Sequence, residues 1–449
     1  MASSVLETTC CIVGGGPAGM MLGYMLARQG VEVTVLEKHQ DFFRDFRGDT
    51  VHPSTLEVLG EFGLLDEFLN LPHQQVKSAG AVIGGSTFRM ADFRHLPTRC
   101  KFVALMPQWD FLNFLSSHAR QLPGFQVLMK HEVVDLRRSG QRVAGVVARS
   151  DGQEVEVRAD LVVGCDGRHS VTRRAGGLEV IEHGVPIDVL WFRISRRPGD
   201  PAEVLGNINY GKALILIDRS DYFQAGLIIR KGSYDRIVAR GIEAFRADIR
   251  ELVPWMGERV NELQDWEEIK ILTVQINRLR RWHRPGLLCI GDAAHAMSPA
   301  GGVGINLAIQ DSVAAANRLA RPLKERRVCE ADLAAVERRR VFPTRITQAI
   351  QVAAHRGLAR AFENTGPVHA PWQMKAAQQI PGIHQALGYV IGVGVRPEHV
   401  REGTRAHQRG ARLTGMVCAG AGFAAVCGWA AWKMWSRAHD RGGKPLVSR

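Results

Sequence analysis

The sequence predicts an α/β fold in which a mainly parallel sheet flanked by helices is interrupted by an inserted antiparallel sheet and followed by a C-terminal helical tail. Near the N-terminus, a short apolar strand runs into a glycine-rich turn and a helix. Two later apolar strands end in Asp-Gly and Gly-Asp, and alternating apolar and polar residues lie between them. At 449 residues the chain exceeds the roughly 300 residues at which one hydrophobic core stops growing, so we expect more than one domain.

Composition favours a folded globular protein and excludes several other classes. Hydrophobic residues make up 45% and charged residues 23% of the chain, values typical of folded domains. The eight cysteines form no Cys-x-x-Cys pair and no histidines cluster at ligand spacing, so we predict reduced thiols and no metal site. Because the N-terminus lacks a basic region followed by an apolar core, we expect no secretory signal and a cytoplasmic location for the main domain.

The first motif is a glycine-rich turn between a strand and a helix, with the spacing Gly-x-Gly-x-x-Gly. In this setting it is a dinucleotide-binding fingerprint of a Rossmann-like domain. Its first glycine permits a tight turn, its second lets the backbone approach a pyrophosphate, and its third lets the helix pack on the strand. The pyrophosphate would lie at the positive end of the helix. The residues that we assign to this turn are Gly14, Gly16, Pro17, Ala18 and Gly19.

A second strand, residues 31–36, ends at an acidic residue. Glu37 follows Gly19 by 18 residues, close to the spacing of about 20 at which an acid binds a ribose diol. We therefore assign Glu37, with its neighbour Lys38, to the ribose end of the site, and Glu37 favours a free 2′-hydroxyl. A chance glycine-rich turn is the alternative for the glycines alone, and both strands and Glu37 argue against it.

Two later motifs identify a family. Residues 161–173 read Leu-Val-Val-Gly-Cys-Asp-Gly-Arg-His-Ser-Val-Thr-Arg, and residues 286–295 read Gly-Leu-Leu-Cys-Ile-Gly-Asp-Ala-Ala-His. With the first motif, they resemble the motifs of the class A FAD-dependent aromatic hydroxylases, the family of p-hydroxybenzoate hydroxylase and of the ubiquinone-biosynthesis hydroxylases. The resemblance covers residues 8–400 in order. It implies an FAD-binding domain of the p-hydroxybenzoate hydroxylase type.

The resemblance also implies roles for particular acids. Asp292 should bind the ribityl chain of FAD, because a carboxylate accepts hydrogen bonds from sugar-like hydroxyls. Asp166 should contribute to the flavin and nicotinamide region. For Arg173, contact with the cofactor and a structural role in the Asp-Gly turn remain equal alternatives.

Two stretches match the family less closely. Arg47 and Gly48 look like the Arg-x-Gly region near the pyrophosphate and the isoalloxazine ring. Either Arg47 or Arg44 could instead form a surface ion pair, and we favour Arg47 as the cofactor residue. Gln108, at the start of a predicted helix, matches a family position that touches FAD.

A second glycine-rich turn opens a helix after the Gly-Asp motif. In this family the corresponding turn lies beside the flavin ring, so its free N–H groups would stabilise negative charge at N1 and the C2 oxygen during reduction. A plain helix cap is the alternative. The residues that we assign to this turn are Pro299, Gly302, Val303, Gly304, Ile305 and Asn306.

The predicted domains are discontinuous along the chain. Residues 1–75, 105–180 and 275–400 should form the FAD-binding domain. Residues 76–104 and 181–274, whose strands alternate between apolar and polar residues, should form an antiparallel substrate domain over the flavin. We expect substrate selectivity to reside on the inner face of that sheet.

The mechanism implied by the resemblance is reduction of FAD by NADH or NADPH, reaction with O2 to a flavin C4a-hydroperoxide, and transfer of one oxygen atom to an electron-rich carbon. Because the cofactor supplies this chemistry, no acid–base pair is required and we assign no catalytic residue. His295, Tyr210 and Tyr222 are left unassigned, since His295 fits a structural role and the tyrosines do not align with the family. The chain has no second dinucleotide fingerprint, which fits transient binding of the nicotinamide.

The C-terminal segment departs from the family. Residues 401–449 hold nine basic and two acidic residues, a charge of +7 out of the chain's +13, which favours an anionic membrane over nucleic acid. Residues 413–432 are uncharged and long enough, as a helix, to cross a bilayer. We expect residues 413–435 to anchor the protein to a membrane. Packing on the protein, or a dimer contact through the small residues, is the alternative.

These features predict an FAD-dependent monooxygenase that hydroxylates or epoxidises an apolar aromatic, quinone-like or isoprenoid small molecule. An FAD-dependent reductase of the same fold is one alternative, and a non-catalytic membrane-associated flavoprotein is another. A flavin halogenase is disfavoured, because the chain has no Trp-x-Trp-x-Ile-Pro sequence. The substrate and the oligomeric state are not predicted.

Overall fold

The computed structural model describes residues 4–43, 50–201, 205–219, 221–363, 366–370 and 372–401. The chain divides into two compact units, Met1–Ala406 and His407–Arg449, and every described residue belongs to the first unit. Arg47 and Gly48 of the predicted site, and the predicted membrane helix 413–435, lie outside the described residues.

One sheet has eight strands and a parallel centre. The carboxyl ends of its central strands, residues 10–13 and 161–164, are apolar and buried, as expected for strands covered on both faces. Across the sheet the strands are β19 (His283–Arg284), β20 (Leu287–Cys289), β11 (Gln153–Gly164), β1 (Ser4–Val13), β2 (Val33–Leu36) and β8 (Phe125–Leu128), with β10 (Arg142–Ser150) and β9 (Glu132–Ser139) extending antiparallel from β11.

The register of this sheet brings the motifs together. Val13, the last residue of β1, lies opposite Gly164 of β11 and Leu36 of β2. Gly164 in turn lies opposite Cys289 of β20. Because parallel strands end at one edge, the glycine-rich turn, Glu37 and both Asp motifs all follow at the carboxyl edge of the sheet. This is where open α/β sheets bind their ligands.

Helices cover the eight-stranded sheet and connect it to the rest of the unit. The helix α1 (Pro17–Arg28) packs against α8 (Val303–Lys324) and α4 (Gln108–Ala119). Its apolar side chains are almost fully buried there. The remaining helices of this region are α2 (Pro53–Phe62), α3 (Leu65–Leu69), α5 (Val171–Ala175) and the 3-10 helices η3 (Gly291–Ala293) and η4 (Ala300–Gly302).

The second large sheet has seven strands. All neighbours are antiparallel except one pair, so the predicted antiparallel sheet is mixed. The parallel pair joins the two chain segments that were expected to form the substrate domain. The strands, in order, are β17 (Lys270–Leu272), β13 (Ile187–Ser195), β16 (Tyr222–Arg230), β15 (Lys212–Asp218), β14 (Leu205–Asn209), β5 (Ser78–Ile83) and β6 (Ser86–Asp92), with the parallel pair formed by β14 and β5.

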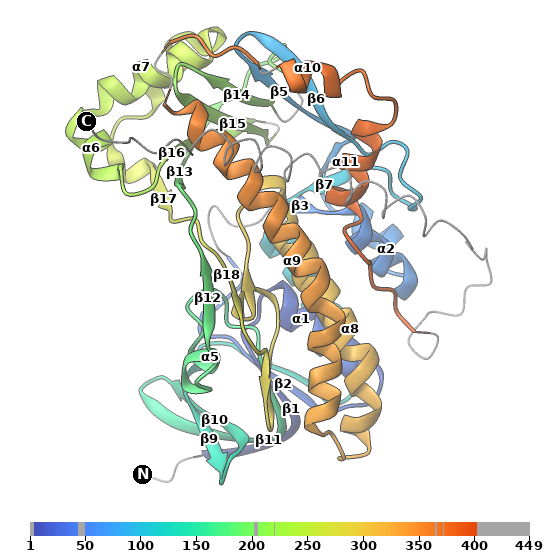
Figure 1. Ribbon diagram of the computed structural model, residues 1–449. Helices are drawn as coiled ribbons and strands as arrows, with labels where there is room; N and C mark the ends of the chain where they lie inside the picture. Colours follow the sequence, from blue (N-terminus) through green and yellow to red (C-terminus); the bar gives the residue numbers. More distant parts are fainter. Residues whose placement is uncertain are drawn as a thin grey trace, which may run out of the picture. The chain divides into compact units, whose positions relative to one another are not determined.

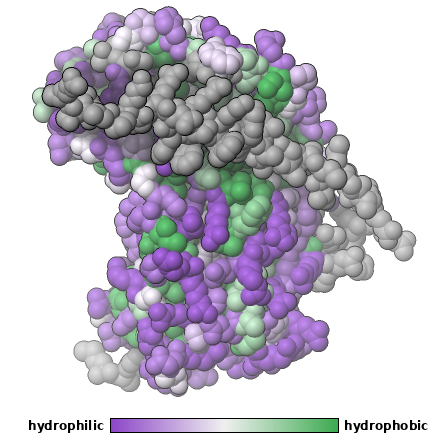
Figure 2. Space-filling model, viewed as in Figure 1, coloured by the Kyte–Doolittle hydropathy of each residue, from purple (hydrophilic) through white to green (hydrophobic). Residues whose placement is uncertain are grey.

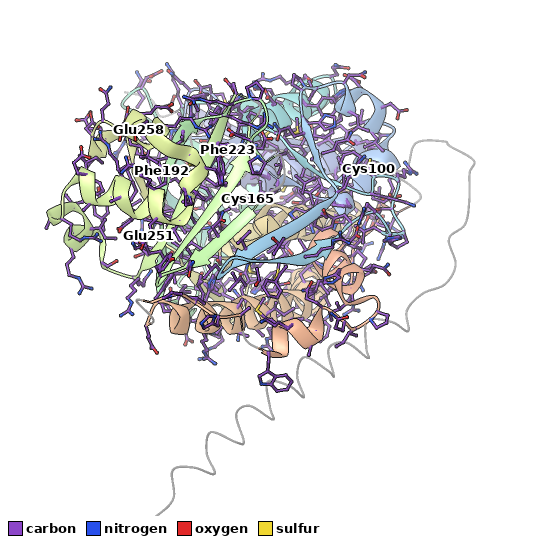
Figure 3. The ribbon with its side chains drawn as sticks, turned by 90° about the horizontal axis from the view of Figure 1, so that it is seen from above. Cys100, Cys165, Phe192, Phe223, Glu251 and Glu258 are labelled. Carbon is purple, nitrogen blue, oxygen red and sulfur yellow. The ribbon has the colours of Figure 1, made fainter. Side chains whose placement is uncertain are left out.

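Helices cover one face of the seven-stranded sheet. Phe192 of β13 and Phe223 of β16 belong to the apolar cluster on this face, and Figure 3 labels both near the helices that carry Glu251 and Glu258. The cluster also contains Phe245, whose ring meets that of Phe192 edge to face. The covering elements are α6 (Tyr234–Ala239), α7 (Ile242–Leu252), η1 (Pro254–Glu262) and η2 (Trp266–Glu268).

A long helix, α9 (Glu330–Ala361), runs between the two large sheets (Figure 1). It packs against α8 and β19 on the side of the eight-stranded sheet. Near its other end, Val352, Leu358 and Phe362 join an apolar cluster with Trp191 on the second face of the seven-stranded sheet. The same helix therefore contacts both regions of the unit.

Two small sheets and two short helices complete the unit. The sheet β3-β7-β4 lies beside α2, and the sheet β12-β18-β21 connects the two larger sheets (Figure 1). The helix α11 packs against β6. The elements are β3 (Thr50–Val51), β4 (Gln74–Val76), β7 (Val103–Leu105), β12 (Val180–His183), β18 (Ile276–Leu279), β21 (His295–Ala296), α10 (Trp372–Ala377) and α11 (Ile383–Gly392).

The surface shown in Figure 2 is largely hydrophilic over the eight-stranded sheet, with a few apolar patches. Among the described residues, no helix combines the length and the hydropathy that a membrane crossing needs.

Candidate cofactor site

The turn between β1 and α1 uses its three glycines differently. Gly14 has φ +104°, and a Cβ atom there would lie 2.4 Å from the carbonyl oxygen of Cys165. A Cβ atom on Gly19 would lie 2.0 Å from the carbonyl oxygen of Gly14. By contrast, a Cβ atom on Gly16, the N-cap of α1, would meet nothing within 4 Å. Gly14 and Gly19 are thus required for packing, whereas Gly16 leaves open space before the helix N-terminus.

Glu37 closes this turn from the end of β2. Its Oε2 accepts a hydrogen bond from the N–H of Gly15 at 2.9 Å, and its Oε1 accepts one from the N–H of His39 at 3.1 Å. The residue is buried, while the adjacent Lys38 is exposed. Pro17 and Ala18 form the first turn of α1, whose free N–H groups and dipole suit an anion.

The carboxylate of Asp166 is engaged within its own turn. Its Oδ2 accepts the N–H of Thr172 and its Oδ1 accepts the Thr172 hydroxyl, both at 2.9 Å. The side chain of Arg173 donates to the carbonyl oxygen of Arg168 in the same turn. Both Asp166 and Arg173 therefore hold the Asp-Gly turn in shape.

Arg168 links this turn to the Gly-Asp motif. Its Nε donates to Oδ2 of Asp292 at 3.0 Å, and its Nη2 donates to the carbonyl oxygen of Met297 at 3.0 Å. Its buried Nη1 has no hydrogen-bond partner among the described residues. Asp292 keeps 32% of its side chain exposed. The sequence analysis did not assign a role to Arg168, because its partners lie more than 120 residues away in the chain. The only signal in the sequence was its position directly after Asp-Gly.

The turn before α8 is held by residues from β3 and its continuation. Gly301 and Gly302 both have positive φ, +78° and +63°. The carbonyl oxygen of Gly302 accepts hydrogen bonds from Oγ1 of Thr50 and Nε2 of His52, each at 3.0 Å. A Cβ atom on Gly302 would lie 2.4 Å from Oγ1 of Thr50. Glycine is therefore required at this turn both for conformation and for space.

The residues that follow this turn form the start of α8. Asn306 is buried, and its Oδ1 accepts hydrogen bonds from Ser54 at 2.5 Å and Thr55 at 3.1 Å. Its carbonyl group is thus directed to α2. The other predicted residues differ in exposure: Val303 is buried, whereas Pro299, Gly304 and Ile305 are half-buried. Gln108 is half-buried in the first turn of α4.

His52 was not predicted, although a histidine directly before the proline that opens a helix is a recognisable position. It is 1% exposed. Burial lowers the pKa of His52 to about 4, against the opposing effect of its hydrogen bond to the Gly302 carbonyl. The imidazole is therefore neutral at neutral pH, with its Nε2 proton directed to Gly302.

Buried charges support the Gly-Asp motif from behind. Asp311 of α8 accepts the N–H of Gly291 at 3.0 Å and pairs with Nε2 of His295 at 2.6 Å and Nε of Arg340 at 2.9 Å. Burial raises the pKa of the Asp311 carboxyl, but His295 and Arg340 more than offset this and hold the pKa below its usual value. The structural role expected for His295 is thus what its contacts give it.

The residues present fit FAD. Two helix N-termini without side-chain caps, at Gly16 and Gly302, provide free N–H groups for phosphate and for the ring. Open space at Gly16 admits a pyrophosphate, and the partly exposed carboxylate of Asp292 can accept hydrogen bonds from ribityl hydroxyls. FAD bound there would supply electron transfer and oxygen activation, and the chain would supply position and electrostatics.

Comparison with known proteins also indicates an FAD-binding protein. A family model described as an FAD binding domain matches residues 7–350. The chain is 32% identical over 380 residues to 6-methylpretetramide 4-monooxygenase of Streptomyces rimosus, covering 83% of this chain and 89% of that protein. It is 27% identical over 335 residues to the uncharacterized aromatic compound monooxygenase YhjG of Bacillus subtilis, covering 71% of this chain and 63% of that protein.

Solved structures share the fold. The probable FAD-dependent monooxygenase PqsL from Pseudomonas aeruginosa superposes with a TM-score of 0.68 at 22% identity, covering 80% of this chain and 98% of that one. The anhydrotetracycline hydroxylase of Streptomyces rimosus gives 0.69 at 21% identity, covering 88% and 78%. With the family model and the 32% identical relative, the chain belongs to the FAD-dependent aromatic monooxygenases and is an FAD-dependent oxidoreductase.

Proposed function

We propose that this protein uses NADH or NADPH and O2 to hydroxylate or epoxidise an apolar small molecule, by the flavin oxygen chemistry that its family resemblance implies. The observation that carries the proposal is the gathering of the glycine-rich turn, Glu37 and both Asp motifs at one sheet edge. A fused-ring aromatic compound is the preferred substrate, because the 32% identical relative is a 6-methylpretetramide monooxygenase. Quinone-like and isoprenoid compounds are the other classes to test.

The site residues divide between the two ends of FAD in this proposal. Gly14, Gly16, Gly19 and Glu37 would bind the adenosine and pyrophosphate, and Asp292 the ribityl chain. The turn from Pro299 to Asn306 would lie beside the ring, with Arg47, Gly48, Gln108 and Asp166 contributing around it. Residues 1–75, 105–180 and 275–400 would then act as the FAD-binding domain.

We propose that the face of the seven-stranded sheet opposite α6 and α7, in residues 76–104 and 181–274, receives the substrate. A row of residues crosses this sheet in register: Trp191, Gly226, Ile215, Gly206 and Ala81. A Cβ atom on Gly226 would lie 2.9 Å from the Trp191 ring, so the indole lies over this glycine. The row is apolar and mostly small, which suits a flat apolar molecule.

The test is oxygen incorporation by the purified full-length protein. We expect NADH or NADPH to bleach the flavin without O2, and ¹⁸O2 to place one labelled atom in 6-methylpretetramide, a quinone or an isoprenoid. Saturation of a substrate double bond without label would identify the reductase alternative instead. If neither NADH nor NADPH reduces the bound flavin, both the monooxygenase and the reductase are rejected and the non-catalytic flavoprotein is favoured.

We also propose that residues 413–435 attach the enzyme to a membrane, which would bring it to lipid-soluble substrate. The support is the uncharged run of twenty residues with basic flanks. We expect the full chain to remain with membranes after alkaline washing, and Ala424→Arg with Ala425→Arg to release it. Recovery of both forms in the washed supernatant would leave packing on protein as the role of this segment.

A further inference from the structure

The inner face of α9 carries polar side chains where apolar ones would be expected. Gln348, Gln351 and His355 are 2%, 5% and 3% exposed. The spacing of three and four residues places them on one side of the helix. Buried polar groups are normally hydrogen-bonded, so their partners indicate what they do.

Gln351 binds the backbone that leads into the turn before α8. Its Oε1 accepts the N–H of Ser298 at 3.1 Å, and its Nε2 donates to the carbonyl oxygens of Ser298 and Ala300, each at 3.0 Å. One amide thus satisfies three backbone groups of two residues. Because both its donor and its acceptor are used, the side chain fixes the distance of this segment from α9.

His355 holds the same segment through its side chain. Its Nε2 lies 2.7 Å from Oγ of Ser298, and this hydroxyl also accepts the N–H of Ala300 at 3.2 Å. Burial lowers the pKa of His355, so the ring is neutral at neutral pH. Ser298 is therefore held at its backbone by Gln351 and at its side chain by His355.

This clamp acts directly on the start of α8. Ala300 is followed by Gly301 and Gly302, whose positive φ values turn the chain into the helix. A shift of Ser298 and Ala300 therefore moves the first N–H groups of a 22-residue helix. Electrostatic stabilisation by such groups depends on their being fixed in place beforehand, and a displacement of about 1 Å can cost a reaction two orders of magnitude.

We propose that Gln351, assisted by His355, is a positioning residue that sets the N-terminus of α8 against the reacting ring of FAD. The proposal rests on the proposed function, in which the turn from Pro299 to Asn306 lies beside that ring. Gln351 itself need not touch the cofactor. Its effect is on the ratio between the protein's affinities for reduced FAD and for oxidised FAD.

The test compares two glutamines of one helix in the full-length FAD-bound protein. Gln351→Met removes the clamp. Gln348→Met is the matched control, because Gln348 is equally buried but donates to the carbonyl oxygens of Asn277 and Ala296, outside the turn. The measurements are thermal stability, the dissociation constant of oxidised FAD and the midpoint potential of the flavin.

We expect both variants to lose stability and only Gln351→Met to change the potential. The ratio of reduced-FAD to oxidised-FAD affinity should fall about tenfold, which is about 30 mV for a two-electron couple. Equal potentials in the two variants would show that Gln351 is merely structural and would overturn the proposal. Should Gln351→Met not fold, Gln351→Asn, which is neutral and one methylene too short for these contacts, replaces it, and the same lowered potential is expected.

A third variant, Gly302→Ala, separates this inference from the function on which it rests. Its methyl group would press on Thr50 and displace the turn independently of α9. If Gly302→Ala changes the potential and Gln351→Met does not, the turn lies beside the ring but Gln351 does not position it. If neither changes the potential, the placement of the turn beside the ring is wrong, and the proposal falls with it.

Discussion

At the scale of single residues, Arg168 shows how a side chain in one recognised motif can join it to another. Its guanidinium contacts Asp292 and the Met297 carbonyl, so it ties the Asp-Gly turn to the Gly-Asp motif. Only one oxygen of Asp292 is used in this pair. The side chain of Asp292 stays 32% exposed, and the proposed function assigns it to a ribityl hydroxyl, in an orientation that Arg168 sets.

Replacing this guanidinium should therefore weaken FAD binding. We expect Arg168→Met to raise the dissociation constant of FAD about tenfold, in line with the loss of a charge-assisted hydrogen bond. The measurement is titration of the apoprotein with FAD, followed by flavin fluorescence. Arg284→Met, which removes a contact with the Gly177 carbonyl, is the control and should leave binding unchanged. Equal affinity in both variants would mean that Asp292 needs no such support.

His52 predicts a loss of stability in acid. Its pKa in the folded protein, about 4, lies below the usual 6.5, so the folded state resists protonation. The contribution of neutral His52 is complete above pH 6.5 and is lost as pH falls from 6.5 towards 4, by at most about 1.4 kcal/mol per pH unit. The free energy of unfolding, measured with urea at pH 7, 5.5 and 4.5, should fall less steeply with pH for His52→Gln than for the parent protein. If both proteins lose stability equally as the pH falls, groups other than His52 cause the acid sensitivity.

Sequence alone predicted geometry where the reason is local. The packing of Gly14 and Gly19 follows from their spacing, because strand, turn and helix are consecutive in the chain. The binding of ribose by Glu37, whose carboxylate contacts the N–H of Gly15, stays a prediction. The contacts of Arg168 with Asp292 and of Asn306 with Ser54 join residues 124 and 252 positions apart. No pattern within a single segment carries such information, so these roles required the structure.

At the scale of elements, the turn between β1 and α1 needs Gly19 for packing, whereas Gly16 leaves space for a cofactor. Gly19→Ala should destabilise the protein even without cofactor, because the new methyl group would lie 2.0 Å from a backbone oxygen. Gly16→Ala should keep the melting temperature of the apoprotein, because the space is open, but should weaken FAD binding at least tenfold by filling the approach of the pyrophosphate. Thermal melts and FAD titration of the two apoproteins provide the measurement. An apoprotein of Gly16→Ala as unstable as that of Gly19→Ala would contradict this division.

The seven-stranded sheet shows that the positions of strands are easier to predict from sequence than their pairing. Alternating residues predict strands within residues 181–274, and the structure has β13, β15 and β16 there. The parallel pair β14 and β5 was not predicted, since an alternating pattern gives a strand its buried face but not the direction of its neighbour. That direction depends on how segments far apart in the chain meet.

At the scale of the whole molecule, buried charges join three parts of the chain. Arg340 of α9 contacts Asp311 of α8 and, at 3.4 Å, Glu398 beyond α11. We expect Arg340→Met to lower the free energy of unfolding by about 3 kcal/mol, because it removes the buried guanidinium from Asp311 and Glu398, which keep only His295 and Arg339 as ion-pair partners among the described residues. Chemical denaturation measures this. Arg338→Met, on the exposed side of the same helix, should change it by less than about 0.5 kcal/mol.

The order of strands across the eight-stranded sheet has a consequence for synthesis. One edge of β1 pairs with β2, which follows it closely, but the other pairs with β11, which ends at residue 164. The edge of β11 that faces away from β1 pairs with β20, which ends at residue 289. A growing chain therefore displays an apolar strand edge for much of its time on the ribosome, and an exposed edge of this kind recruits other chains. Fragments that stop before residue 153 should aggregate, and yield in a cell should depend on chaperones that bind nascent chains.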